Sequence, residues 1–203
     1  MLRTLLLAAS IPGAALAQPA IPVAEVLTAL PGSTLTIRGS TSIGARWHCR
    51  SDGMESRVAV APRPAGSPNV IPEVRGVTVF VPVSALRCQS GPMERAMRRA
   101  LRADTDTAAL HIVGRFEVPD TIPAPQFNEA HLVGGLRVAG VERGVFLRAI
   151  VEPQEDGTLH VRSVIPLTLS QFRIDAPRVL FGAVRARDAI AVDVDLRFPP
   201  PKG

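Results

Sequence analysis

Apolar and polar residues alternate along much of this chain. The clearest segment is 190–198, where Ile, Val, Leu and Phe at even positions alternate with Ala, Asp and Arg at odd positions. Successive side chains of a β-strand point to opposite faces, so this pattern predicts a half-buried strand. The same reasoning predicts strands over 34–38, 46–49, 58–60, 76–83, 110–118, 131–139, 145–151, 159–161 and 164–169.

The residues between these segments favour turns. The chain has 19 prolines and 16 glycines, which argue against long helices. The proline-rich segment 61–73 is predicted to be a loop, and Glu142-Arg143-Gly144 a turn. Asp156-Gly157 is a hairpin signal. Strands of this number, joined mostly by hairpins, fit an antiparallel barrel or sandwich. The regular alternation favours a closed barrel with an apolar interior.

One segment, 91–104, has the period of a helix. Met93, Ala96, Met97, Ala100 and Leu101 fall on one face, and arginines cover the other. The basic face could bind lipid head groups, or the helix could simply cover the mouth or edge of a sheet. We favour the second interpretation, because the apolar face is small for membrane insertion.

The first 17 residues have the features of a cleaved signal peptide. Arg3 precedes a short apolar run, and Ala15-Leu16-Ala17 supplies a small-x-small cleavage pattern. The run is too short and interrupted for a transmembrane anchor. We expect cleavage after Ala17, a leader over 18–33, one domain over 34–198, a tail over 199–203, and a periplasmic or secreted protein.

Export changes how the cysteines and charges are interpreted. Cys49 and Cys88 are the only two cysteines, and an even count in an oxidising compartment predicts a structural disulfide rather than a metal or redox site. The net charge is +5, carried mostly by arginines scattered among acids. We therefore expect no nucleic-acid partner, while an anionic head group or a membrane surface stays open.

Several segments together resemble one known family, in the family's order. They are Gly39–Ser42 with Trp47, Val81–Leu86, Met93 with Ala100–Asp104, Leu136–Val145 (LRVAGVERGV), Leu167–Pro177 (LTLSQFRIDAP) and Phe181–Val192 (FGAVRARDAIAV). These segments resemble the motifs of the YceI-like family. The resemblance implies a lipocalin-like antiparallel β-barrel of about eight strands around a long apolar cavity, and binding of a polyisoprenoid or related lipid without a catalytic reaction or a cofactor.

The chain departs from the family pattern at two places. The family's His-x-Trp start is replaced by Ile43-Gly44-Ala45-Arg46-Trp47, with His48 after the tryptophan, and the glycine of S-x-F-G-I is Arg173.

The candidate cavity residues are large and apolar: Trp47, Phe80, Phe116, Phe146, Leu169 and Phe172. The candidate head-group contacts are Arg46, Arg173 and Arg178, because guanidinium groups suit phosphate.

No motif for nucleophilic, metal-dependent or nucleotide chemistry is present in the sequence. Each of the four histidines, His48, His111, His131 and His160, stands alone in a strand-like segment, and we expect no metal site and no enzymatic activity.

The leading hypothesis is a periplasmic carrier of a polyisoprenoid or an isoprenoid-tailed quinone. The alternatives are a structural or stress-related envelope protein with a closed barrel core, and an enzyme that uses a pocket histidine.

Overall fold

Antiparallel strands make up most of the molecule. The structure is a computed structural model that describes residues 25–60, 74–101, 108–112 and 128–201. The strands are β1 (Glu25–Thr28), β2 (Thr34–Thr41), β3 (Arg46–Ser51), β4 (Glu55–Val60), β5 (Val74–Val81), β6 (Arg87–Cys88), β7 (Ala108–Ile112), β8 (Asn128–Val138), β9 (Val141–Pro153), β10 (Leu159–Thr168), β11 (Arg178–Val179) and β12 (Val184–Phe198). The helical elements are η1 (Val83–Ala85), α1 (Gly91–Ala100), η2 (Ser170–Phe172) and η3 (Leu180–Gly182).

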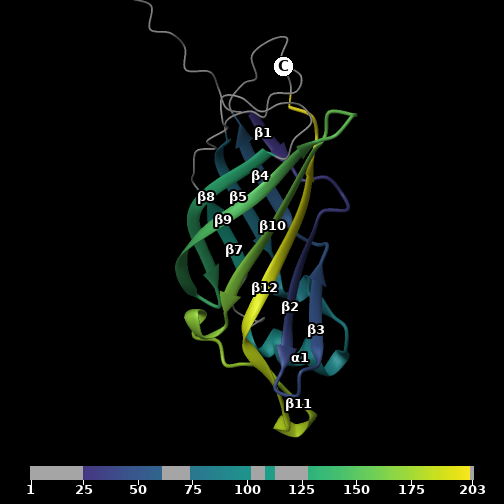
Figure 1. Cartoon of the computed structure of the whole chain (residues 1–203), viewed down its shortest axis with the longest axis vertical. Coiled ribbons are helices and arrows are strands. Elements are labelled where there is room, and N and C mark those ends of the chain that lie inside the picture. The colour runs from purple at the N-terminus through teal and green to yellow at the C-terminus, as the bar shows by residue number, and fades with distance from the viewer. Residues whose placement is uncertain (1–24, 61–73, 102–107, 113–127, 202–203) are drawn as a thin grey trace, which may run out of the picture.

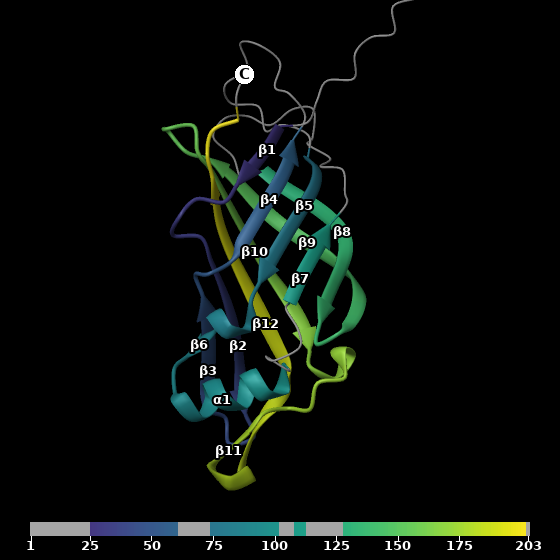
Figure 2. The ribbon, with the colours of Figure 1, turned by 180° about the vertical axis from the view of Figure 1, so that it is seen from behind.

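These strands form one strongly curved sheet. Its order is β1-β4-β5-β7-β8-β9-β10-β12-β2-β3-β6, with β11 paired to β12 beside that path. The sheet wraps around a central core, with β9 and β10 in front and β4 and β5 behind (Figures 1 and 2). At one end the segment after β1 lies against β12, because the backbone N–H of Leu30 donates to the carbonyl of Arg197 on β12 at 2.7 Å. The predicted fold class, a lipocalin-like antiparallel β-barrel, is confirmed.

The alternation predicted from sequence sets which side chains face inward. On β9, Val145, Leu147, Ala149 and Val151 are buried while most of their neighbours are exposed. Eight of the described strands have six residues or more, as expected for a barrel of about eight. Of the remaining short strands, β1 and β6 lie at the two ends of the sheet, and β11 pairs with the start of β12. The residues on either side of β7 lie outside the described ranges.

The turn between β8 and β9 differs from the prediction. It lies at Ala139-Gly140, both with positive φ (49° and 78°), and Val138 pairs directly with Val141. Two successive residues with positive φ make the tight turn that matches strand twist, and glycine adopts such a φ readily. The predicted turn at 142–144 is wrong, since those residues belong to β9, where Gly144 pairs with Gly135.

Two further boundaries also differ from the sequence predictions. Segments 159–161 and 164–169, predicted as two strands, form the single strand β10. β1 lies within the segment predicted as a leader, and its four residues pair with β4. A four-residue strand carries too little alternation to be recognised in a sequence.

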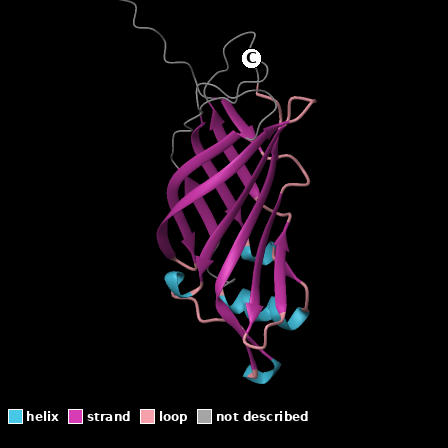
Figure 3. Ribbon diagram, in the orientation of Figure 1, coloured by secondary structure: helices cyan, strands magenta, loops and turns pink. Residues whose placement is uncertain are grey.

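Helix α1 lies at one end of the barrel (Figure 3). Ser90 caps it by accepting a hydrogen bond from the backbone N–H of Met93, and a proline occupies its first turn. Its buried face carries Met93, Ala96 and Met97, as predicted. The helix packs against β6 and β11 and contributes to a second core cluster, distinct from the cluster inside the long strands.

The predicted disulfide is confirmed. Cys49 of β3 and Cys88 of β6 are directly opposite in the ladder and are covalently bonded, and Cys49 is fully buried. The bond closes a loop of 39 residues and ties the strand before α1 to the sheet. The predicted signal peptide, and the predicted loop over 61–73, lie outside the described residues.

Candidate functional site

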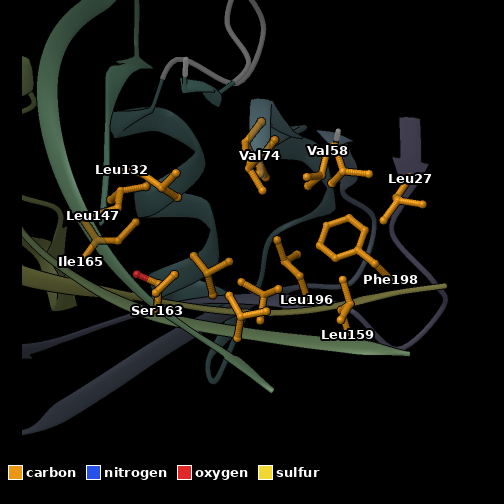
Figure 4. Close-up of a pocket in the computed structure, with 17 residues that line it drawn as sticks. Leu27, Val58, Val74, Leu132, Leu147, Leu159, Ser163, Ile165, Leu196 and Phe198 are labelled. Atoms are coloured by element: carbon orange, nitrogen blue, oxygen red, sulfur yellow. The ribbon is translucent and has the colours of Figure 1, made fainter. Parts of the chain in front are cut away.

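An apolar cavity lies inside the barrel near the end where β1 meets β12. Its volume is about 60 Å³. Strands from nearly the whole circumference contribute side chains that point into it (Figure 4). The lining residues are Leu27, Val58, Val60, Val74, Val77, Val79, Leu132, Leu147, Ala149, Val151, Leu159, Val161, Ser163, Ile165, Val194, Leu196 and Phe198.

A second cavity lies towards α1. Its volume is about 90 Å³. Met97 of α1 and Leu101, the residue after it, line one side, and the segment around η2 contributes Leu169, Phe172 and Ile174. The other lining residues are Leu35, Ile37, Val79, Val81, Val83, Leu86, Leu136, Val138, Ile165, Leu167, Ile190, Val192 and Val194.

The two cavities are neighbours along the barrel. Val79 of β5, Ile165 of β10 and Val194 of β12 line both of them. The two cavities therefore adjoin and form two sections of one apolar path inside the barrel. A long flexible molecule could occupy both sections.

The lining is almost free of polar groups. Ser163 is the one polar residue among the described residues that line the two cavities, and its Oγ donates to the carbonyl of Arg148 at 2.8 Å. A ligand inside the barrel would therefore meet aliphatic and aromatic carbon and one hydroxyl that already has a partner. Such a surface can bind a hydrocarbon by burial, and it offers nothing with which to orient a polar substrate.

An empty apolar cavity of this kind costs stability. Side chains that face a void lose the dispersion contacts that a packed neighbour would supply, at about 24 cal/mol per Å³. For cavities of 60 and 90 Å³ the cost is about 1–2 kcal/mol each. An apolar void does not recover this energy by taking up water, because water needs polar partners. A hydrocarbon ligand would recover it.

Three buried hydroxyl groups without a hydrogen-bond partner among the described residues lie elsewhere in the interior, on Thr41, Ser51 and Ser56. Ser51 and Ser56 are each about 1% exposed. Ser56 lies on the same face of β4 as Val58 and Val60, which line the first cavity. Neither serine lines a cavity, so these hydroxyl groups offer no polar contact to a ligand there, and burying them without a hydrogen bond lowers the stability of the fold.

Leu169 and Phe172, two of the residues predicted to line a cavity, both line the second one. Trp47 is buried in the core cluster next to α1 but lines neither cavity, and its Nε1 donates to the carbonyl of Ser40 at 3.2 Å. Phe80 is half-buried and lies on the opposite face of β5 from Val79, away from both cavities.

The prediction that Phe146 faces the interior is wrong. Its side chain is 61% exposed on the outer face of β9 and contacts the ring of His131 edge to face. Val145 and Leu147, its neighbours along the strand, hold the inward positions. Phe116 lies outside the described residues.

The three candidate arginines do not converge on the cavities. Arg46, Arg173 and Arg178 are all exposed, and none lines either cavity. Arg173 has φ 56° and ψ 35°, the left-handed conformation, directly after η2. This is the position where the family motif carries glycine, so the arginine adopts there a backbone conformation that glycine favours.

The described histidines lie on the outer surface. His160 contacts Asp195 at 2.8 Å, and His131 contacts Glu129 at 2.6 Å. Hydrogen bonds from Arg148 and then from His131 lower the pKa of Glu129. No described histidine lines a cavity, and no cluster of metal-ligating side chains occurs among the described residues. The side chain of His111 lies outside the description.

Most of the aliphatic lining cannot be recognised from the sequence, where aromatic residues are the natural candidates because of their size. Valine, leucine and isoleucine on the inward faces form most of both cavity walls. The alternation located these positions, but any inward aliphatic residue can equally fill a core. Only the three-dimensional arrangement separates a residue beside a cavity from one that is fully packed.

Comparison with known proteins gives a likeness at the level of structure. The sequence matches no model of a protein family and no curated protein. A polyisoprenoid-binding domain from Saccharophagus degradans, implicated in plant cell wall breakdown, superposes with a TM-score of 0.62 at 11% identity, over 87% of this chain and 98% of that one.

Two further solved structures are similar. Burkholderia cenocepacia BcnA superposes with a TM-score of 0.57 at 14% identity, over 81% of this chain and 94% of that one. The Campylobacter jejuni YceI protein gives 0.50 at 13% identity, over 70% and 79%. At such identities the likeness establishes the fold, and this chain has the YceI-like fold, a lipocalin-like antiparallel β-barrel.

Proposed function

We propose that this chain is an exported lipid-binding protein that holds a polyisoprenoid, or a quinone with an isoprenoid tail, inside the barrel. The observation that carries the proposal is the pair of adjoining cavities lined by aliphatic and aromatic side chains and a single hydroxyl. Burying a hydrocarbon chain yields about 0.8 kcal/mol per methylene-sized group, so a few isoprene units would give useful affinity without polar contacts. One structural neighbour is a polyisoprenoid-binding domain.

The shape of the cavities supports a thin, flexible ligand. The two sections adjoin at Val79, Ile165 and Val194. The described lining offers a polar head group only the hydroxyl of Ser163, so the head group would stay at the barrel end or outside. The proposal is therefore binding through the tail, with the head group left accessible.

Export and the absence of catalysis belong to the same proposal. A disulfide in a small barrel fits an oxidising compartment, and the first 17 residues have the pattern of a signal peptide. None of the described residues that line either cavity is titratable, so this part of the lining offers no general acid or base. A structural protein with a closed core is the alternative, and the two apolar cavities in the barrel interior argue against it.

The test is native mass spectrometry of protein purified from the periplasm of the cells that make it. A matched pair of variants sharpens the result. Val194→Phe adds volume at a position that lines both cavities, and Val164→Phe adds the same volume to an exposed outer position on β10. Circular dichroism and the fluorescence of Trp47, the only tryptophan, verify that both variants fold.

We expect bound lipid of isoprenoid mass on the wild type and on Val164→Phe, and little or none on a folded Val194→Phe. Adding the lipid should also raise the thermal midpoint of the wild type. A wild-type protein that carries no lipid and shows no thermal shift would overturn the proposal. Equal lipid on both variants would place the ligand outside the cavities, with the same consequence.

A further inference from the structure

A projecting apolar tip lies at one end of the barrel, at the bottom of Figure 1. Leu180 and Phe181 belong to η3, the tight connection between β11 and β12. Leu180 is 64% exposed and Phe181 is 112% exposed, so the phenylalanine ring stands free of the protein. Both residues have positive φ (51° and 55°), a conformation that leucine and phenylalanine rarely adopt.

A second loop adds to this tip. Ile43, in the turn between β2 and β3, is 72% exposed. The two loops are joined, because the backbone N–H of Ser42 donates to the carbonyl of Arg185 at 2.7 Å, and the N–H of Arg185 donates to Ser42 Oγ at 3.3 Å. Three large apolar side chains therefore project from neighbouring loops at the same end. Exposed apolar groups that gather in this way mark interaction sites.

Arginines surround these side chains. Arg178 and Arg185 are directly opposite each other in the β11–β12 ladder, and Arg46 begins β3 next to the Ile43 turn. All three are exposed, and none forms an ion pair with a carboxylate among the described residues. Two like charges directly opposite in a ladder are unfavourable, and an anionic partner would relieve that repulsion.

Among the described residues, carboxylates are fewer than arginines on this stretch of chain. They are Asp175 and Asp188, and Asp188 accepts two hydrogen bonds from Ser170 and interacts electrostatically with Arg185. Arg187 adds a further exposed cation, bonded through Nε to the carbonyl of Thr41. Helix α1, which packs against β11, carries more exposed arginines. The surroundings of the apolar tip are therefore positive.

From this combination we propose that the tip formed by Ile43, Leu180 and Phe181 docks on an anionic phospholipid bilayer. Apolar side chains inserted at the interface, with arginines at the level of the head groups, are the features by which proteins bind a membrane surface without crossing it. No helix among the described residues is long and apolar enough to span a membrane. The proposal thus describes a protein that rests on the bilayer through one end.

This inference goes beyond the binding of a lipid inside the barrel and does not depend on it. It also indicates which end of the two adjoining cavities would face the bilayer. The second cavity is the one lined by Met97 and Leu101, at the α1 end of the barrel, and α1 packs against β11. Docking through the tip would bring that end of the hydrocarbon path, rather than the end near β1, to the bilayer.

The test is co-sedimentation of the full mature protein with vesicles, of phosphatidylcholine alone or of phosphatidylcholine and phosphatidylglycerol at a ratio of about three to one. The tip variant is Leu180→Ser with Phe181→Ser. The matched control is Val133→Ser with Phe146→Ser, an exposed apolar pair that lies cross-strand on the outer face of β8 and β9. The charge variant is Arg178→Glu with Arg185→Glu.

We expect the wild type and the control pair to bind the anionic vesicles. The tip variant should bind at least about tenfold more weakly, as expected when two large apolar side chains no longer insert. The charge variant, neutral vesicles and 0.5 M salt should each weaken binding as well. Native mass spectrometry of the tip variant should still find the lipid content of the wild type, so failure of docking and failure of cargo binding are distinguishable.

Three results would overturn the proposal. The first is a wild type that binds neither kind of vesicle. This result has the same consequence if the tip is found to bind a protein partner instead. The second is a tip variant that binds anionic vesicles as well as the wild type does. The third is a control pair that loses as much binding as the tip variant, since that would assign the effect to general surface hydrophobicity.

Discussion

The carboxylate of Asp188 accepts two hydrogen bonds from Ser170, one from the backbone N–H at 2.8 Å and one from the hydroxyl at 2.6 Å. Ser170 begins η2, and Asp188 lies on β12. The pair therefore fixes the short helix that supplies Phe172 to the wall of the second cavity. The hydroxyl of Ser170, and then its N–H, lower the pKa of Asp188 from its ordinary 3.8.

This lowered pKa predicts a pH-dependent contribution to stability. A carboxylate with a lower pKa in the folded state contributes fully above its unfolded pKa, and the contribution disappears as the pH falls through the folded value. Asp188→Asn should lower the thermal midpoint at pH 5–7, and its difference from the wild type should shrink below pH 3.8. Thermal unfolding between pH 2 and 7 measures this. Asp175→Asn, at an exposed position, controls for the substitution itself, and a pH-independent loss in Asp188→Asn would contradict the assignment.

The ring of Trp47 leaves no room for a side chain at position 39. A Cβ at this position would lie 2.6 Å from Cζ2 and 2.8 Å from Cε2 of Trp47. Gly39→Ala should therefore lower the free energy of unfolding by about 1–3 kcal/mol, the usual cost of overpacking a core. Urea denaturation followed by tryptophan fluorescence measures it. Gly76→Ala, where the nearest atom to an added Cβ is 4.0 Å away, should be tolerated. Equal losses in both variants would show that strand propensity, and not contact with Trp47, determines the change in stability.

The positions of Gly39 and Trp47 show how far the sequence alone could be interpreted. Alternation predicted the strand at 46–49, and Trp47 is buried as an inward residue should be. It did not show that the indole lies against the backbone at Gly39 instead of beside a cavity. Packing of this kind depends on the sheet register between β2 and β3, which brings Gly39 opposite Trp47. Register follows from the whole barrel rather than from one strand.

The apolar tip was equally hidden in the sequence. Phe181-Gly182 begins one of the segments that resemble the family motifs, and apolar residues are normally expected to be buried. Their exposure follows from the tight connection between β11 and β12, and β11 is two residues long, too short to show alternation. By contrast, the disulfide followed from the cysteine count and the predicted compartment, because two cysteines allow only one intramolecular pairing.

The buried hydroxyl of Ser56 predicts a stabilising substitution. Its Oγ has no hydrogen-bond partner among the described residues, and a buried polar group without a partner costs about 1–3 kcal/mol. Ser56→Ala should therefore raise the free energy of unfolding by about 1 kcal/mol. Ser163→Ala removes a hydroxyl that is bonded to the carbonyl of Arg148, and it should lower stability instead. Opposite signs in urea denaturation are expected, and a loss at both positions would mean that Ser56 is also hydrogen-bonded, through water or ligand.

The disulfide predicts sensitivity to reductant. In the chain-entropy model, closing a loop of 39 residues contributes about 4 kcal/mol. The free energy of unfolding should fall by about this amount when the protein is reduced under denaturing conditions and refolded with reductant present. Cys49→Ala with Cys88→Ala should show the same loss and no further response to reductant. Unchanged stability after complete reduction, verified by thiol titration, would contradict the prediction.

Arg173 tests whether its backbone conformation or its charge matters more. Its φ of 56° places a side chain in the left-handed region, which costs about 1–2 kcal/mol for a residue other than glycine. Arg173→Gly removes that cost but adds freedom to the unfolded chain, worth about 0.4–1 kcal/mol. The net expectation is a gain of up to about 1 kcal/mol in the free energy of unfolding. Arg173→Ala removes the charge but keeps the Cβ, so it should bring no such gain in urea denaturation. If glycine and alanine stabilise the protein equally, the guanidinium in this positive end of the barrel, rather than the strained backbone, is the source of the effect.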